Sequence, residues 1–233
     1  MRHAKVCVVI LILLISSALG GSMKIKYFGH AMWEIATETT KIIVDPFVEI
    51  GYPMPENLTA DIVIASHDHS DHNNFKLVIP PFQKITQIGT YTVKDAKVKM
   101  IESRHGVLEG RNLGDNFMSL ITIDGITLLH CGDLGIIPEG ETLNEIADVD
   151  ILFIPIGGKF TINAQTAKEL IELIEPKIVF PMHYRTEKST VEIDDFEPFE
   201  TLYPTVEKID SDTFLVTKDE LSSEMKIIKL NYE

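Results

Sequence analysis

From residue 24 onward, short apolar runs bounded by turn residues repeat along the chain. Their length and their content of Val, Ile, Phe and Tyr are typical of strands. The pair Asp124-Gly125 separates two of these runs and predicts a β-hairpin. The pattern predicts strands at residues 24–28, 31–36, 41–44, 61–66, 84–88, 97–101, 117–123, 126–130, 151–156, 177–180, 213–217 and 226–230.

Helical spacing appears in one longer segment, residues 163–174, which Asn163 is predicted to cap. Its apolar face is expected to consist of Ala167, Leu170, Leu173 and Ile174. A shorter helix is expected at residues 142–147, whereas the acidic residues 187–212 are expected to be irregular. Because sheets come first and strands then alternate with helices, the expected fold class is α/β, with helices outside the sheets.

Residues 1–22 differ from the rest of the chain. Two basic residues are followed by an unbroken apolar run at residues 6–15 and then by small residues, as in a signal peptide. The run is too short to span a bilayer, which takes about 20 apolar residues. We therefore predict a signal peptide at 1–22, a single domain at 23–233, and a periplasmic or secreted mature protein with no stable membrane span. The alternative is a start at Met23 and a cytoplasmic protein, because the first strand follows that residue without a linker.

Composition narrows the class of protein. The 233 residues are 45% hydrophobic and 24% charged, which is typical of one folded domain with a sizeable core. The net charge of −14 disfavours binding to nucleic acid or to an anionic membrane and leaves a small molecule as the expected partner. Cys7 lies in the predicted leader, so Cys131 would be alone in the mature chain and is expected to be a small core residue.

The densest cluster of polar chemistry is His67-Asp68-His69-Ser70-Asp71-His72, directly after the apolar run 61–66. Imidazole nitrogen and carboxylate oxygen are ligands of Zn²⁺ at about 2.0–2.2 Å. In an extended turn His67 and His69 point the same way, and Asp71 and His72 can face a second ion. The alternative is a polar surface loop that happens to be rich in histidine. Asp133 and His183 also follow predicted strands, which places the expected site along one edge of packed sheets.

The order of these motifs along the chain resembles that of the metallo-β-lactamase-fold hydrolases: the six-residue motif, then His105, then Gly132-Asp133, then His183. More narrowly, they are similar to the subgroup that includes ascorbate-6-phosphate lactonase-like proteins. The resemblance covers nearly all of residues 24–233 and implies an αββα four-layer sandwich, with two sheets face to face and helices on both flanks. It is supported by Gly29-His30-Ala31, Val44-Asp45-Pro46-Phe47, Pro155-Ile156-Gly157-Gly158 and Pro181-Met182-His183-Tyr184.

The resemblance also implies roles for the site residues. It assigns His67, His69 and His105 to a first metal ion and Asp71, His72 and His183 to a second. Asp133 is expected to bridge the two ions, because two close cations need a shared anion. Nitrogen and oxygen donors fit Zn²⁺ first and Mn²⁺ second. The implied reaction is hydrolysis of an ester-type bond, in a lactone or a phosphoester, by a hydroxide that bridges the ions, with Asp71 and Asp133 as catalytic residues.

Several neighbouring residues have supporting or open roles. Asp45 is expected to orient the histidine loop through hydrogen bonds. His30 either contacts the ligands or substrate or is structural, and His130 is expected to be structural. Gly157, Gly158 and Thr161 either let substrate approach the backbone or form a plain loop.

The chain departs from the subgroup at Gly106, where an acidic residue is usual, at Leu113, where a basic residue is usual, and at Ile136, which often is histidine. None is an expected ligand, so these differences bear on substrate rather than on metal. The alternative functions are a nuclease or phosphodiesterase of the same fold and a non-catalytic metal-binding module. Di-iron relatives that use oxygen typically have glutamate where His69 stands, which disfavours redox chemistry.

Overall fold

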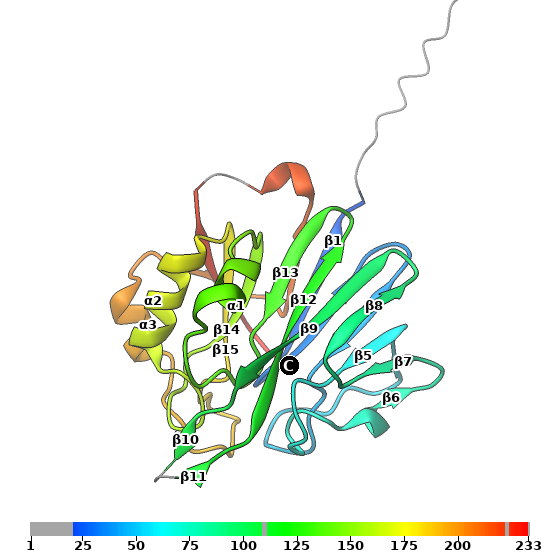
Figure 1. Cartoon of the computed structure of the whole chain (residues 1–233). Helices are drawn as coiled ribbons and strands as arrows, with labels where there is room; N and C mark the ends of the chain where they lie inside the picture. The colour runs from blue at the N-terminus through cyan, green and yellow to red at the C-terminus, as the bar shows by residue number, and fades with distance from the viewer. Residues whose placement is uncertain (1–20, 109–110, 222–223, 233) are drawn as a thin grey trace, which may run out of the picture.

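The computed structural model describes residues 21–108, 111–221 and 224–232 and contains two β-sheets that pack against each other (Figure 1). The first sheet holds six strands in the order β17 (Thr213–Val216), β1 (Met23–Gly29), β2 (Met32–Ala36), β3 (Lys41–Val44), β5 (Ile62–Ile64) and β7 (Gln83–Ile85). The second holds eight, in the order β16 (Glu207–Ile209), β18 (Lys226–Leu230), β15 (Ile178–Met182), β14 (Ile151–Pro155), β13 (Ile126–His130), β12 (Asp115–Ile123), β9 (Ala96–Arg104) and β8 (Gly89–Val93).

Shorter elements connect the sheets. Two small two-stranded sheets pair β4 (Leu58–Thr59) with β6 (Val78–Ile79), and β10 (Val107–Leu108) with β11 (Arg111–Asn112). The helices are α1 (Gly140–Glu145), α2 (Ala164–Ile174) and α3 (Glu197–Leu202), with 3₁₀ helices η1 (Phe75–Leu77) and η2 (Lys218–Glu220).

The main core lies between the two sheets. Alternate residues of each strand face it, as Ile42 and Val44 do in β3, while Ile43 packs on the outer side. Trp33 lies at its centre, stacked on Tyr27 with ring centroids 4.3 Å apart. The central strands are buried on both faces, which explains why their sequences read as continuous apolar runs.

The outer faces of the two sheets are covered differently. Helices α2 and α3 cover the eight-stranded sheet (Figure 1), and α2 buries Ala164, Ala167, Leu170, Ile171 and Ile174 there. The six-stranded sheet is covered by residues 46–60 and η1, with Phe47 and Tyr52 packed against it. The α/β sandwich is thus confirmed, but this flank carries a loop where the resemblance implied helices, because three prolines interrupt residues 46–60.

Most predicted strands and both predicted helices are present, and Asn163 caps α2 by accepting a hydrogen bond from the Thr166 backbone at 2.9 Å. Two predictions were wrong. Leu173 is 53% exposed and Ile171 takes its place on the buried face. Residues 187–212 are not irregular throughout, because α3 and β16 lie in them. Strand β8 was missed, although a tight turn at Lys94 pairs it with β9.

The predicted signal peptide lies outside the described residues, apart from Gly21 and Ser22, so it stays a prediction together with the predicted export. Among the described residues, no helix combines the length and apolar content that a membrane crossing requires.

Candidate metal centre

The strands bring the predicted site residues to one edge of the sandwich. His30 follows β1, Asp45 follows β3 and the histidine-rich loop follows β5 in the first sheet. In the second sheet His105 follows β9, Asp133 follows β13 and His183 follows β15. Strands β3 and β5 are parallel, as are β13, β14 and β15, so their carboxyl ends meet at the same edge.

Three residues at this edge have a backbone conformation that residues other than glycine rarely adopt. His30, Asp45 and His183 have φ values of 53°, 50° and 50°, in the left-handed region. Such residues persist only where their surroundings fix them, and they concentrate at functional sites. Here the His183 backbone N–H donates a 2.7 Å hydrogen bond to the His30 carbonyl, which ties the two strand ends together across the sheets.

Close backbone contacts bring the loops of the second sheet together. A Cβ atom on Gly135 would lie 2.1 Å from the Gly106 nitrogen, so only glycine allows the loops of His105 and Asp133 to approach this closely. A Cβ atom on Gly157 would similarly lie 2.1 Å from the His183 carbonyl oxygen. Gly157 therefore serves the packing of the site's backbone.

Six imidazoles form two groups at this edge. The open group consists of His67, His69 and His105, whose ligand atoms lie within 4.8 Å of one another. The buried group consists of His30, His72 and His183, which meet the same criterion. In the open group His69 is exposed, whereas each member of the buried group is at most 1% exposed.

Asp133 lies between the two groups. Its Oδ2 atom is 3.3 Å from His105 Nε2 and 3.9 Å from His67 Nε2, in the open group. Its Oδ1 atom is 3.3 Å from both His72 Nε2 and His183 Nε2, in the buried group. One carboxylate thus offers one oxygen to each group, which is the arrangement expected of a bridging ligand.

Asp45 and Ser66 lie behind both groups. The fully buried Asp45 carboxylate accepts hydrogen bonds from the Ser66 backbone at 2.7 Å and from the Ser66 hydroxyl at 2.7 Å. The hydroxyl in turn accepts from His67 Nδ1 at 2.9 Å, and His72 Nδ1 donates to Asp45 at 2.9 Å. Asp45 and Ser66 thus hold the Nδ1 atoms of both rings, which places each Nε2 atom on the side of Asp133, 3.9 Å away for His67 and 3.3 Å away for His72.

Asp71 lies at the mouth of the buried group. Its Oδ2 atom is 3.3 Å from His30 Nε2 and 3.8 Å from His72 Nε2, and its side chain is 28% exposed. His30 is fully buried, with its ring centroid 4.1 Å from that of His183, so it contacts ligand candidates rather than solvent.

Charge in the centre is balanced without any lysine or arginine among the contacts described. Burial alone would raise the pKa of Asp133, but the imidazoles of His183 and His72 hold it well below its usual range. Burial lowers the pKa of His67 to about 3 and that of His30 to about 4. Burial acts in the same direction on His72, but the Asp133 and Asp45 carboxylates outweigh it and raise the pKa of His72 well above its usual value. His67 and His30 are therefore neutral imidazoles and Asp133 is an ionised carboxylate, the forms that bind metal, whereas His72 would release a proton when it binds an ion.

The geometry fits metal ions. A tetrahedral ion with ligand distances of about 2.0–2.1 Å holds its donor atoms about 3.3 Å apart, which matches the three shortest distances around Asp133. His72 Nε2 and Asp133 Oδ1 are also buried without a hydrogen-bond partner. Unsatisfied buried polar atoms of this kind are costly unless an ion pairs with them.

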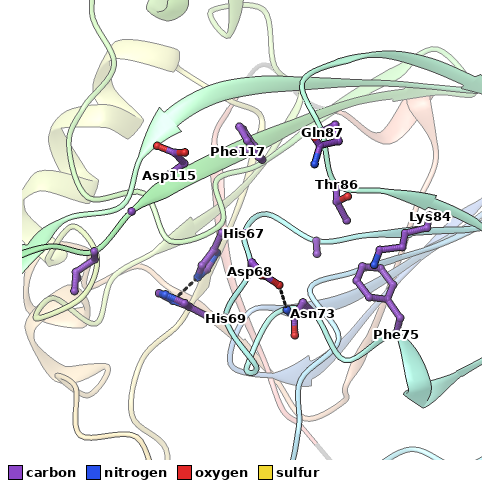
Figure 2. Close-up of a pocket in the computed structure, with 13 residues that line it drawn as sticks. His67, Asp68, His69, Asn73, Phe75, Lys84, Thr86, Gln87, Asp115 and Phe117 are labelled. Carbon is purple, nitrogen blue, oxygen red and sulfur yellow. Dashed lines mark hydrogen bonds between the residues drawn. The ribbon is translucent and has the colours of Figure 1, made fainter.

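Two cavities adjoin the centre. The site chamber, of about 170 Å³, is lined by His69, Asp71, Asp133 and His183, with Leu113, Phe160 and Val191 as its apolar walls. The lateral pocket, of about 560 Å³, begins at His67 and His69 and extends between β7 and β12 (Figure 2). Both cavities are lined by His69 and Leu113, so they lie next to each other, and together they are called the cleft.

Other predicted residues lie where their environment explains them. His130 is buried, with Nε2 donating to the Ala31 carbonyl at 2.9 Å, and is structural as predicted. Cys131 is buried, which raises its thiol pKa and agrees with a core role. The Thr161 hydroxyl bonds the Ile162 carbonyl. Ile136 is 54% exposed and lines neither cavity of the cleft.

Sequence reasoning missed two supporting residues, Ser66 and Asn116. The buried Asn116 side chain accepts from the Asp133 backbone at 2.9 Å and donates to the Cys131 carbonyl at 2.8 Å, so it fixes the turn that presents the bridging carboxylate. A polar residue at the end of an apolar strand was the available signal for each of them.

A sandwich of two sheets with two imidazole groups and a shared carboxylate at one edge defines the metallo-β-lactamase fold and its metal centre. The family model for the beta-lactamase superfamily domain matches residues 24–183. A UPF0173 metal-dependent hydrolase of Carboxydothermus hydrogenoformans is 34% identical over 194 residues, which covers 70% of this chain and 85% of that protein. A second, from Thermococcus onnurineus, is 31% identical, with coverages of 70% and 85%. The chain belongs to the UPF0173 metal-dependent hydrolase family of the metallo-β-lactamase superfamily.

Solved structures agree. A crystal structure from Thermotoga maritima, described as a candidate Zn-dependent hydrolase of this superfamily, is similar with a TM-score of 0.75 and 32% identity. The match covers 89% of this chain and 98% of that one. A diiron β-hydroxylase from Streptomyces venezuelae matches with a TM-score of 0.58 at 16% identity, covering 90% of this chain and 53% of that one. That likeness concerns the fold alone.

Proposed function

We propose that this metal-dependent hydrolase holds two divalent ions and uses them to activate water against an ester-type bond in a small substrate. The observation that carries the proposal is the Asp133 carboxylate, with one oxygen 3.3 Å from His105 and the other 3.3 Å from His72 and His183. A carboxylate shared in this way offsets the repulsion between two cations about 3.5–4 Å apart.

The first ion would be held by His67, His69 and His105, and the second by His72, His183 and Asp71. Nitrogen and oxygen donors suit Zn²⁺, which the description of the Thermotoga relative also favours, with Mn²⁺ as the alternative. When bound, the two ions would lower the pKa of a shared water towards about 7 and stabilise the oxyanion that develops during attack.

Side chains of the chamber would orient the reaction. Asp71 is ionised, because its hydrogen bond from His30 and the nearby His72 imidazole outweigh burial and lower its pKa. It lines the chamber and can hold the attacking water or take its proton at Oδ2. His30 would position Asp71 through their 3.3 Å contact. Leu113, Phe160 and Val191 would exclude bulk water from the reacting group.

The chamber volume of about 170 Å³ favours a small reacting group, such as a lactone or a phosphoester. Membership of the ascorbate-6-phosphate lactonase-like subgroup stays a prediction. Of the departures from that subgroup, Leu113 lines the chamber and Gly106 directly follows His105, which also lines it. Nuclease activity is the alternative. The net charge of −14 and the two carboxylates that line the lateral pocket, Asp68 and Asp115, disfavour a polyanionic substrate.

The test is Asp133→Ala, assayed on lactones and phosphodiesters with Zn- and Mn-loaded protein. We expect loss of at least one of two bound ions and a fall in kcat/KM of at least about a thousandfold, because several kcal/mol of transition-state stabilisation depend on the pair of ions. Asp124→Asn, in the β12–β13 turn, is the control and should keep both ions and full turnover. Full activity with two ions retained in Asp133→Ala would refute the bridging role, and two ions without turnover on any substrate would favour a non-catalytic module.

A further inference from the structure

The lateral pocket has a charged end away from the imidazoles. Figure 2 shows His67 and His69 on one side of the pocket and Lys84, Phe75 and Thr86 on the other. Lys84 belongs to the edge strand β7, and its Nζ lies 3.7 Å from the centre of the Phe75 ring. A cation over an aromatic face is attracted by the ring, so Phe75 holds the ammonium group at the pocket wall.

Lys84 contacts an aromatic ring instead of a carboxylate, as Lys188 and Lys229 also do, but of these three only Lys84 lines the lateral pocket. Lys94, Lys99 and Lys208 each pair with an acidic side chain. In the described part of the chain no carboxylate forms an ion pair with Lys84, although the protein carries a net charge of −14. An aromatic ring satisfies one side of an ammonium group and leaves its N–H donors available to a ligand.

The carboxylates of the pocket lie nearer the imidazoles. Asp68 is in the histidine-rich loop and accepts a hydrogen bond from Asn73, and Asp115 lies at the start of β12, across the pocket from Lys84 (Figure 2). They disfavour negative charge beside the metal centre. A ligand anion therefore gains most at the Lys84 end of the pocket.

We infer that the cleft takes an elongated substrate with its scissile bond in the site chamber and a carboxylate or phosphate group at Lys84. Leu113 and His69, which line both cavities, would contact the neutral segment between the two ends. This inference rests on the proposed function for the position of the scissile bond, but the anion subsite itself does not depend on turnover.

Binding of the anion can be measured without metal. In chelator-treated protein, reductive methylation of lysines is followed by mass spectrometry with and without inorganic phosphate, and separately with glutarate. Phosphate or glutarate should slow labelling of Lys84 several-fold and leave Lys76 unchanged, because Lys76 is exposed on neighbouring η1 but does not line the pocket. Protection by only one probe identifies which anion the subsite takes. Equal labelling of Lys84 with and without both probes would overturn the inference.

Turnover gives the second test. Ester or lactone pairs that differ only in a distal carboxylate or phosphate are assayed with Lys84→Gln, Lys84→Arg and the control Lys76→Gln. Lys84→Gln should raise KM about three- to tenfold for the anionic members and leave kcat nearly unchanged. Lys84→Arg keeps the positive charge, so its KM for the anionic members should stay close to that of the parent. The kinetics of the neutral members should be the same in all variants. An equal change for neutral and anionic members would also overturn the inference. Protection of Lys84 in a protein that hydrolyses none of these compounds would refute the proposed function and leave the anion subsite standing.

Discussion

The buried group and the open group share one carboxylate but are held in different ways. His30, His72 and His183 lie inside the sandwich, with ring contacts among them and two left-handed backbone positions. In the open group His69 is exposed and lines both cavities. The fold thus buries all three imidazoles of one group and leaves one imidazole of the other exposed beside the cleft.

The largest effects should come from removing one imidazole of each group. His69→Ala and His183→Ala should each lose one ion and most of the activity. They should differ in the stability of the metal-free protein: His183→Ala should lower the free energy of unfolding by about 2 kcal/mol, because it leaves a buried cavity. His69→Ala should stay within about 0.5 kcal/mol of the parent, because its side chain is exposed. Urea unfolding of chelator-treated proteins, with metal analysis of the loaded forms, makes the comparison; equal destabilisation would contradict it.

A smaller effect is expected behind the ligands. Asp45→Ala should weaken metal binding about 10- to 100-fold, because the carboxylate orients His72 directly and His67 through Ser66. Ser66→Ala is the matched variant and should weaken mainly the ion of the open group, since His72 keeps its bond to Asp45. Competition against a chromophoric chelator measures both affinities. If both variants lost the same affinity for both ions, Ser66 would not support the open group alone, and the prediction would be wrong.

The smallest effect on the fold should follow from removing the metal ions alone. A chelator should take the ion of the open group first, since His69 is exposed there, and then that of the buried group. The far-UV circular dichroism should hardly change, because the core between the sheets contains none of the ligands, while the melting temperature should fall by a few degrees as the binding free energy is lost. Release of both ions in one step, or loss of the strand signal, would contradict the division into two groups.

The site was more predictable from the sequence than its surroundings. Apolar runs predicted to end at Ser66, His130 and Phe180 placed the ligand candidates at or shortly after strand ends, and parallel pairing brought those strand ends to one edge. The role of His30 could not be decided, because its contact with Asp71 joins residues 41 positions apart. The hydrogen bonds of Ser66 and Asn116 likewise depend on tertiary structure, so the spacing of residues in the sequence does not predict them.

Elements at the periphery were harder to predict for a different reason. Leu173 fits helical spacing, but the described part of the chain leaves its side chain 53% exposed. Helix α3 lies within an acidic segment, and Phe199 is its one buried residue. Phe199 packs in the apolar cluster between the helices and the eight-stranded sheet. In both cases burial is decided by neighbours distant in sequence rather than by the local pattern.

The contact between Gly106 and Gly135 has a consequence for the position of His105. A methyl group at position 135 would act as a wedge between the two loops and move His105 away from Asp133. In the proposed centre, the spacing of these two ligands would therefore depend on residues that do not contact the ion. Glycine at position 135 thus acts on the proposed metal site through the backbone, without supplying a donor atom.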